Sequence, residues 1–338
     1  MNDATARTLA GIASGAIALS NFYGKSSVTG PSQGMFYGGH SGVSGTPYLN
    51  TVTRINRCGA LIGSETTPAG TARGLGAGAA ICTTGVYYGG YYPGAGCSGT
   101  CKTTRINKCG ALVGSETAID ASYKTKCNGG ASIGTNAVFY GGWWGSGGCY
   151  LQTNRVRRVN SSGALVGSVT TVGSLRDNLS GTKIGSIGLY SGGAACRIRC
   201  CCGSPTSCYY RVAVKTRINA CGALVGEAAT VNIIQDAAAS VSTNTYGLFY
   251  GGSNSSGGVI NTVTKYNACG TIIGACTNVG TARYAFSGGG ACTVGIFYGG
   301  WNWPTTYNTT TRINACRALV GTETSVSTTR GSTMGAGV

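Results

Sequence analysis

A basic side chain recurs at one position of a repeated motif, and cations at such regular intervals suit the binding of a polyanion. The motif is a basic residue, an apolar residue, Asn and a glycine turn, as in TRINRCGALIG, and its cations are Arg54, Arg105, Arg158, Arg217, Lys265 and Arg312. A second arginine, in GTAR or a looser relative of it, recurs at Arg73, Arg176, Arg283 and Arg330.

In a closed ring these cations would form an anion-binding face whose affinity falls with salt. The alternative is architectural: each arginine hydrogen-bonds backbone carbonyls or the repeat Glu of a neighbouring strand. We favour the architectural interpretation.

Aromatic side chains form the second candidate site. They follow the repeated FYGG element in loops of variable sequence, at Tyr91, Tyr92, Trp143, Trp144, Trp301 and Trp303. Exposed Trp and Tyr beside Gly and Ser suit stacking on sugar rings or burial in a protein contact, and capping of the repeat is the alternative. The tyrosines of the repeat itself are expected to be packing residues: Tyr37, Tyr88, Tyr140, Tyr190, Tyr250 and Tyr298.

The 17 cysteines fall into two groups. Five share one repeat position, where Ser162 stands in the third copy, and we expect small buried hydrophobes there: Cys58, Cys109, Cys221, Cys269 and Cys316. Others lie in irregular insertions, where local disulfides would form in an oxidising medium: Cys97, Cys101, Cys149, Cys196, Cys200, Cys201, Cys202 and Cys208. A zinc site is not expected, because no matching C-x-x-C pairs occur and the single histidine, His40, lies elsewhere.

Catalytic chemistry has little basis in this sequence. Of the 8 acidic residues, four occupy one repeat position: Glu65, Glu116, Glu227 and Glu323. The others are scattered, and no phosphate loop is present. We therefore predict a non-enzymatic protein that uses no cofactor and no metal.

The elements that position these residues are short strands. With 60 Gly and 19 Tyr and few helix formers, the composition indicates strands and tight turns. The aromatic element begins at Phe36, Tyr87, Phe139, Phe249 and Phe297, with a degenerate LYSGG from Leu189. A period of about 50 residues is typical of kelch propeller blades. Each copy offers about four strands, a hairpin at N-x-C-G, and an apolar strand at residues 60–62 that suits a sheet covered on both faces.

The two ends of the repeat array are complementary. The last copy stops at TRGSTMGAGV, where an aromatic strand should follow, and the first aromatic strand, residues 34–39, has no partner upstream. Docking one on the other would complete six blades and remove the open edges. The predicted fold is an all-β, six-bladed kelch-like propeller at 34–338, closed by an N-terminal strand and preceded by an extension at 1–33. An open solenoid is the alternative.

The formal charge of +17 indicates attraction to polyanions. The longest weakly apolar run, residues 9–20, is about half of what a membrane helix needs, so no membrane insertion is expected. Residue Asp3 and the weak apolar run argue against a signal peptide. A nucleic-acid-binding module would rest on charge alone, so nucleic acid is not the expected partner.

The repeat from residue 34 onward resembles the kelch-like Gly/Tyr repeats of bacteriophage virion proteins. The segment RTLAGIASGAIALSNFYGKS, residues 7–26, is similar to a short segment common in phage tail and fibre proteins. It also parallels the repeat's own GTAR-to-aromatic half, so a decayed half-blade is the alternative for that segment.

The resemblance implies a virion protein present in multiple copies, whose partners are other virion proteins and host surface polysaccharide. It implies a location on the tail, fibre or capsid and a role in assembly and host attachment. The alternative is a secreted or cell-surface lectin-like adhesin that binds anionic glycans outside the cell.

Overall fold

The computed structural model describes residues 32–41, 47–92, 99–121, 123–145, 149–195, 198–200, 210–229, 234–243, 245–291, 293–326 and 328–338. The chain divides into two units, Met1–Gly30 and Pro31–Val338, and the account below concerns the second. The predicted extension at 1–33 lies almost entirely outside the described residues. In the described ranges every regular element is a strand, and no helix there is able to cross a membrane. The predicted all-β class is confirmed.

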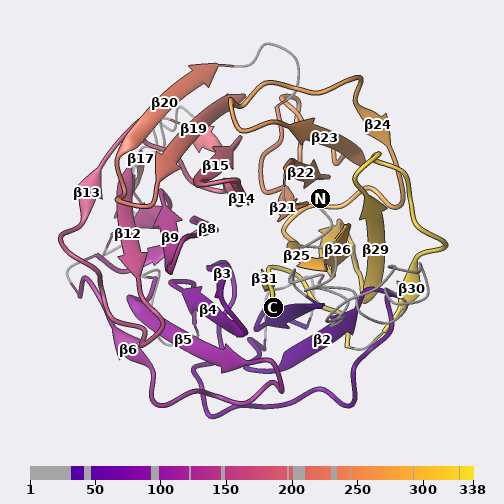
Figure 1. The fold of residues 1–338 in the computed structure, drawn as a ribbon, viewed down its shortest axis with the longest axis horizontal. Coiled ribbons are helices and arrows are strands. Elements are labelled where there is room, and N and C mark those ends of the chain that lie inside the picture. The colour runs from indigo at the N-terminus through magenta and orange to yellow at the C-terminus, as the bar shows by residue number, and fades with distance from the viewer. Residues whose placement is uncertain are drawn as a thin grey trace, which may run out of the picture. The chain divides into compact units, whose positions relative to one another are not determined.

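Six antiparallel sheets hold most of the strands (Figure 1). From the innermost strand outward they are β31 (Met334–Gly337), β1 (Gln33–Tyr37) and β2 (Val52–Asn56); β3 (Ala77–Ile81), β4 (Thr84–Tyr88), β5 (Lys102–Asn107) and β6 (Thr117–Ala118); β8 (Gly129–Ile133), β9 (Asn136–Tyr140), β12 (Arg155–Val159) and β13 (Thr170–Thr171); β14 (Ser180–Ile184), β15 (Ile187–Ser191), β19 (Val214–Asn219) and β20 (Leu224–Ala229); β21 (Ala239–Ser242), β22 (Gly247–Tyr250), β23 (Thr262–Tyr266) and β24 (Thr277–Asn278); and β25 (Ser287–Ala291), β26 (Val294–Tyr298), β29 (Thr309–Asn314) and β30 (Thr324–Ser325).

Three smaller sheets are built from the connections that follow the Gly-Gly pairs, together with β7 from the segment that precedes β8. They are β7 (Thr125–Lys126), β10 (Trp143–Trp144), β11 (Cys149–Gln152) and β17 (Ile198–Cys200); β16 (Ala194–Ala195) and β18 (Tyr210–Arg211); and β27 (Trp301–Asn302) and β28 (Thr305–Thr306). The variable part of each repeat thus adds local structure without disturbing the main sheets.

The two ends of the Pro31–Val338 unit meet in one sheet. Strand β1 pairs with β2 on one side and with the C-terminal strand β31 on the other, with Gly34 opposite Gly337 and Tyr37 opposite Met334. This confirms the predicted docking of the first aromatic strand on the C-terminal segment. The pairing leaves no open edge on β1, which would otherwise be an edge prone to pairing with other chains.

The innermost strands contact one another in a cycle. Strand β3 contacts β8, then β14, β21, β25 and β31 follow in turn, and β31 contacts β3 again, as the centre of Figure 1 shows. Glycine permits this close approach: a Cβ on Gly78 would lie 2.3 Å from the carbonyl oxygen of Gly335, and one on Gly130 would lie 2.5 Å from that of Gly78. At the equivalent place Ser240 donates a hydrogen bond to the Gly181 carbonyl.

A closed cycle of backbone hydrogen bonds also runs around this centre. The residue two positions before each innermost strand donates its N–H to the carbonyl of the equivalent residue beside a neighbouring sheet, over 2.5–3.0 Å. The six residues, in cyclic order, are Leu75, Ser332, Ala285, Ala237, Asn178 and Cys127. All six have φ between 52° and 61°, a conformation that turns the N–H and the carbonyl toward the two neighbouring sheets.

We expect this backbone conformation to control stability at Ala285, where φ is 53°. Because left-handed backbone costs a β-branched residue most and glycine nothing, Ala285→Val should lower the free energy of unfolding by about 2 kcal/mol. The Ala285→Gly variant should raise it by about 0.5 kcal/mol. Urea unfolding measures both, with the exposed Ala111→Val as control, and equal stability of the two Ala285 variants would contradict the prediction.

The tyrosines expected to pack the repeats are fully buried, which confirms that prediction. Five of the six hydroxyls donate to backbone carbonyls, as Tyr37 does to Thr71 and Tyr140 does to Ser174, and that of Tyr88 does not. The fourth copy needs a correction. There Ser191 occupies the second aromatic position, opposite Ser180, and Tyr190 stands in the first, where its hydroxyl donates to Val138.

The N-x-C-G turns form as predicted. In the first, the Asn56 side chain accepts hydrogen bonds from the N–H groups of Cys58 and Ala60, and Gly59 has a φ of 82°. The strand expected at residues 60–62, directly after this turn, does not form. Residues 60–62 form only an isolated bridge between Leu61 and Ile55 and are exposed or half-buried, and the chain bridges β2 again only at Thr66, opposite Val52.

The five repeat cysteines are exposed, not buried, because they lie at the tip of this turn: Cys58, Cys109, Cys221, Cys269 and Cys316.

Candidate functional site

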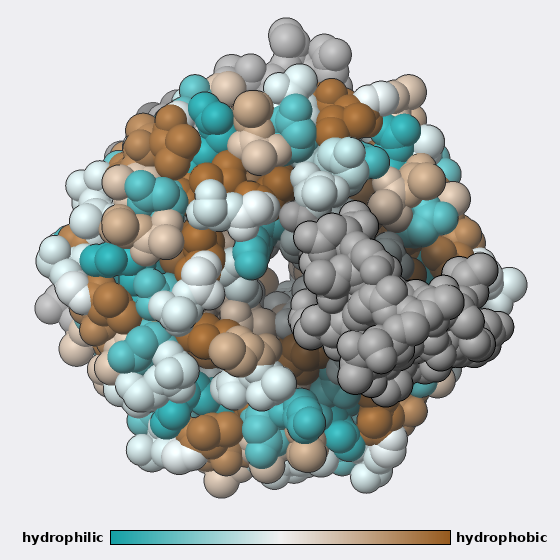
Figure 2. Space-filling view, viewed as in Figure 1, coloured by the Kyte–Doolittle hydropathy of each residue, from teal (hydrophilic) through white to brown (hydrophobic). Residues whose placement is uncertain are grey.

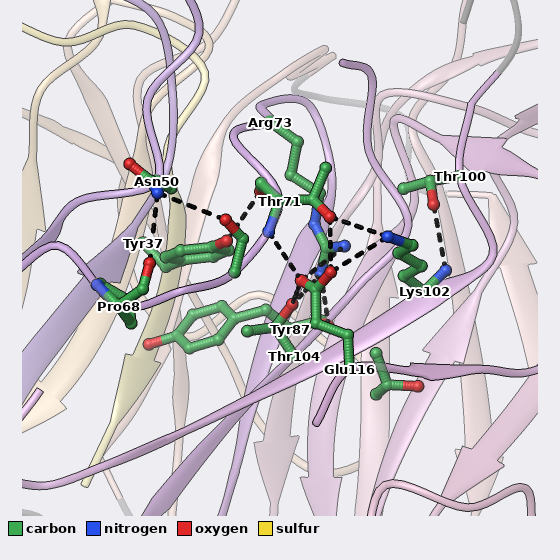
Figure 3. Close-up of polar contacts among 12 residues, drawn as sticks. Tyr37, Asn50, Pro68, Thr71, Arg73, Tyr87, Thr100, Lys102, Thr104 and Glu116 are labelled. Carbon is green, nitrogen blue, oxygen red and sulfur yellow. Dashed lines mark hydrogen bonds and ion pairs between the residues drawn. The ribbon is translucent and has the colours of Figure 1, made fainter. Parts of the chain in front are cut away.

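The most conspicuous buried polar group is a pair that joins adjacent sheets, formed by the GTAR arginine of one repeat and the Glu of the next (Figure 3). We call it the junction pair. Arg73 has no exposed surface, and its Nη1 lies 3.6 Å from Oε1 of Glu116. Its Nη2 donates to the Tyr87 carbonyl and to Thr104, whose hydroxyl in turn donates to Glu116.

The carboxylate of Glu116 is held by more than the arginine. Its oxygens accept from the N–H and the hydroxyl of Thr71, and Lys102 Nζ lies 3.3 Å away. Burial by itself raises the pKa of Glu116, but Arg73 and the hydrogen bonds from Thr104 and Thr71 outweigh it and lower the pKa to about 2. The pair therefore remains charged at neutral pH.

The same pair recurs between other sheets. Arg176 reaches Glu227, and Arg283 reaches Glu323, at 3.8 and 3.7 Å. Arg330 of the last repeat bonds to Glu65 of the first, which ties the two ends of the array together. All four GTAR arginines have no exposed surface, so the architectural interpretation holds for them and they offer no anion-binding face.

Two junctions keep the function of the pair with different residues. In one the charges are exchanged: Asp120 of the earlier repeat accepts from Nε of Arg157, at 2.8 Å, and Arg157 stands where other repeats have Thr. In the other the pair is neutral. The amide of Gln235 donates to two backbone carbonyls, as Arg283 does at its own junction, and Cys276 replaces the carboxylate.

The cations of the other motif are half-buried on the third strand of each sheet: Arg54, Arg105, Arg158, Arg217, Lys265 and Arg312. Several reach the hairpin turn of the following sheet. Arg105 donates to the carbonyl of Ser161, and Lys265 donates to that of Ala315 while lying 3.8 Å from the Tyr246 ring centroid. These two cations thus bridge neighbouring repeats, and anion binding by the set stays a prediction.

A buried lysine outside both motifs has a large expected effect on stability. Lys215 is 1% exposed, and burial, aided by Arg176, lowers its pKa to about 7. Between about pH 7 and the unfolded value near 10.4, the unfolded chain holds the proton more tightly, so stability rises with pH and the cost is largest below pH 7.

We expect Lys215→Met to raise the free energy of unfolding by about 2 kcal/mol at pH 6 and by much less at pH 10. Urea unfolding at both values measures this, with the exposed Lys183→Met as control. A gain that does not change with pH would contradict the assigned cause.

Three of the predicted aromatic residues, Tyr91, Trp143 and Trp301, come directly after a Gly-Gly pair. The residue after each Gly-Gly pair bridges the segment that precedes an innermost strand, as Tyr91 does with Gly74 and Trp301 with Tyr284. In four repeats this residue is aromatic, and in two it is small: His40, Tyr91, Trp143, Ala194, Ser253 and Trp301.

Ring contacts connect the aromatic members. Trp301 stacks on Tyr284 and contacts His40 edge to face. Tyr48 in turn contacts both His40 and Tyr91. Lys126 lies above Tyr91 and Trp143. The result is an arc of packed rings that crosses several repeats.

The predicted aromatics therefore differ in availability. Trp143 is buried, Trp144 lies 4.6 Å from the Tyr123 ring centroid, and Tyr92 is half-buried. Trp303 is 69% exposed at the tip of the β27–β28 hairpin. Of this set, Trp303 is the side chain with most surface to offer a ligand.

A cavity of about 450 Å³, which we call the axial pocket, lies beside this hairpin. Tyr284, Trp301 and Trp303 line it together with Arg211 and Asp236. A second cavity of about 540 Å³ is lined by the innermost strands of all six sheets. The residue immediately before each innermost strand borders both cavities: Gly76, Asn128, Leu179, Ala238, Phe286 and Thr333. The hollow at the centre of the face in Figure 2 lies where the innermost strands of Figure 1 converge.

Most of the predicted disulfide cluster lies outside the described residues: Cys97, Cys196, Cys201, Cys202 and Cys208. Cys101 is buried and free. The backbone of Cys200 in β17 is opposite Cys149 in β11. No group of three or more potential metal ligands occurs within the described part of the chain.

Comparison with protein-family models and with curated proteins found no match for this chain.

Proposed function

We propose that residues 34–338 form a six-bladed kelch-like β-propeller that serves, without enzymatic activity, as a structural and attachment component of a bacteriophage particle. The six sheets, the contact cycle of their innermost strands and the hydrogen-bond cycle around the axis support the propeller. The resemblance of the repeat and of residues 7–26 to phage virion proteins supports the setting.

One observation carries the attachment role: the connections that vary from repeat to repeat also carry accessible aromatic surface, while the sheets that hold them repeat regularly. The connections after the Gly-Gly pairs differ in length and composition, and one of them carries the exposed Trp303. Recognition residues are commonly carried by loops on a rigid scaffold. The charged groups of the junction pairs bind each other between sheets, so we assign recognition of a ligand to the loops.

Cryo-electron microscopy of the native particles that contain this chain tests the proposal. We expect ring-shaped density of six blades, with propellers at a tail tip or fibre. Propellers tiled over a capsid would replace attachment by a scaffolding or decorating role, and a chain found on no particle would overturn the virion assignment in favour of a secreted adhesin.

A further inference from the structure

The axial pocket has the volume of a small-ligand site and two walls of different chemistry. Its volume of about 450 Å³ falls within the range of roughly 300–1,000 Å³ that small-molecule sites span. Trp301 and Trp303 line it with aromatic surface, which we call the aromatic wall, and Arg211 and Asp236 line it with polar groups, which we call the polar wall. Pockets that combine aromatic surface with a few placed polar groups are the usual form of a binding site.

The aromatic wall has one ring committed to packing and one available. Trp301 stacks on Tyr284 at a centroid distance of 5.2 Å and an interplanar angle of 29°, which fixes its position. Trp303, two residues on, keeps 69% of its surface exposed while lining the pocket. An exposed indole at a pocket gains free energy when an apolar face covers it, and the C–H face of a pyranose ring has the matching size and shape.

The polar wall suits hydroxyl groups better than charge. Nε of Arg211 donates to Oδ2 of Asp236 over 3.2 Å, so the pair brings a carboxylate and a guanidinium together with little net charge. A sugar hydroxyl donates and accepts at once, and both partners are present here. A phosphate or a nucleic-acid backbone would meet the carboxylate of Asp236, which disfavours it.

We propose that the axial pocket binds a pyranose residue of a surface polysaccharide, with the ring stacked on Trp303 and its hydroxyls bonded to the Arg211–Asp236 pair. The formal charge of +17 attracts acidic polysaccharides to the protein as a whole, while the pocket recognises the sugar ring itself. This proposal rests on the proposed attachment role for its biological setting only.

Saturation-transfer NMR and calorimetry on the full chain test the proposal, with the methyl glycosides of glucose, galactose, mannose and N-acetylglucosamine as probes. At least one should bind, and Trp303→Ala should weaken that binding at least tenfold. Asp236→Asn should weaken it by a similar factor. Trp144→Ala is the matched control, because Trp144 packs on Tyr123 and does not line the pocket, and it should leave binding unchanged.

Because Trp303 is exposed, its replacement should leave thermal unfolding unchanged, which separates loss of binding from loss of folding. Binding of these uncharged glycosides should persist in 0.5 M NaCl, and its loss in that salt would overturn ring stacking as the source of the binding. Equal binding by Trp303→Ala and the unmodified chain, or no binding of any probe, would also overturn it. Those results leave the particle assignment standing, since microscopy tests it independently.

Discussion

Replacing Glu116 by Cys is expected to lower the free energy of unfolding by about 3 kcal/mol, because the change leaves the buried charge of Arg73 without its carboxylate. Replacing the other partner of the pair, Arg73→Gln, should lower the free energy of unfolding by about 2 kcal/mol. The loss is smaller because Thr71 and Lys102 still hold Glu116. Both substitutions are taken from another junction of the same molecule, where Gln235 and Cys276 stand in these places.

The double variant is the decisive one. If a Gln and a Cys together can replace the charged pair, the double variant Arg73→Gln with Glu116→Cys should lose less stability than the two single variants added together. We expect the difference in the free energy of unfolding to be at least about 1 kcal/mol. Urea unfolding at pH 7 measures all three variants. Strict additivity would mean that the two side chains act independently, and it would contradict the junction pair as a unit.

The junction pair also predicts how stability changes in acid. The pKa of Glu116 is about 2 in the folded chain, below its ordinary value near 4.3, so its contribution is present above the unfolded value and is lost as pH falls through the folded one. The Glu116→Cys variant should therefore differ from the unmodified chain much less at pH 2 than at pH 7.

A second large effect is expected at the centre. Gly78→Ala should lower the free energy of unfolding by about 3 kcal/mol, because the added Cβ would lie 2.3 Å from the backbone oxygen of Gly335. Neither strand is able to retreat, since each is also packed against the next in the cycle. Urea unfolding of the purified variant measures the loss.

Two controls separate close packing from the general effect of losing a glycine. Gly185→Ala adds a Cβ that meets nothing within 4 Å, at a φ of 60°, and should cost about 1 kcal/mol. Ser240→Gly, at the equivalent position in another sheet, introduces no clash and should cost only the hydrogen bond to Gly181 and the flexibility of glycine, about 1.5 kcal/mol. A Gly78→Ala variant as stable as Gly185→Ala would show that the strands are free to separate.

Much of the frame was predictable because each repeat carries the same local signals. The aromatic-Gly strand, the TRIN strand and the Asn-anchored turn recur in order, and each depends on residues near in sequence, so reading one copy predicts the others. The burial of Tyr37 and the pairing of the first strand with the last followed from this regularity. The fourth copy was misaligned by one position, because LYSGG offers Tyr190 where the register requires Ser191.

The junction pairs were partly predictable. A repeated Arg and a repeated Glu suggested a contact between neighbouring strands, and four junctions have it. The exchange of charges at Asp120 and Arg157 was missed, because each residue departs from the consensus separately and only their proximity shows the compensation. The exchange could have been found by aligning the repeats and noting that an acidic residue at position 120 and a basic residue at position 157 depart from the consensus together.

The sequence by itself determined the class of structure, the number of repeats and the meeting of the two ends, because strands, turns and strand pairing are encoded by residue types over short spans. Only the tertiary structure decided which cations are buried, that the turn cysteines are exposed, and that six unlike residues form one hydrogen-bond cycle. The axial pocket belongs to the second group, since Arg211, Asp236 and Trp303 come from different repeats. Burial and proximity of this kind depend on how sheets pack side by side, and no local residue pattern records that.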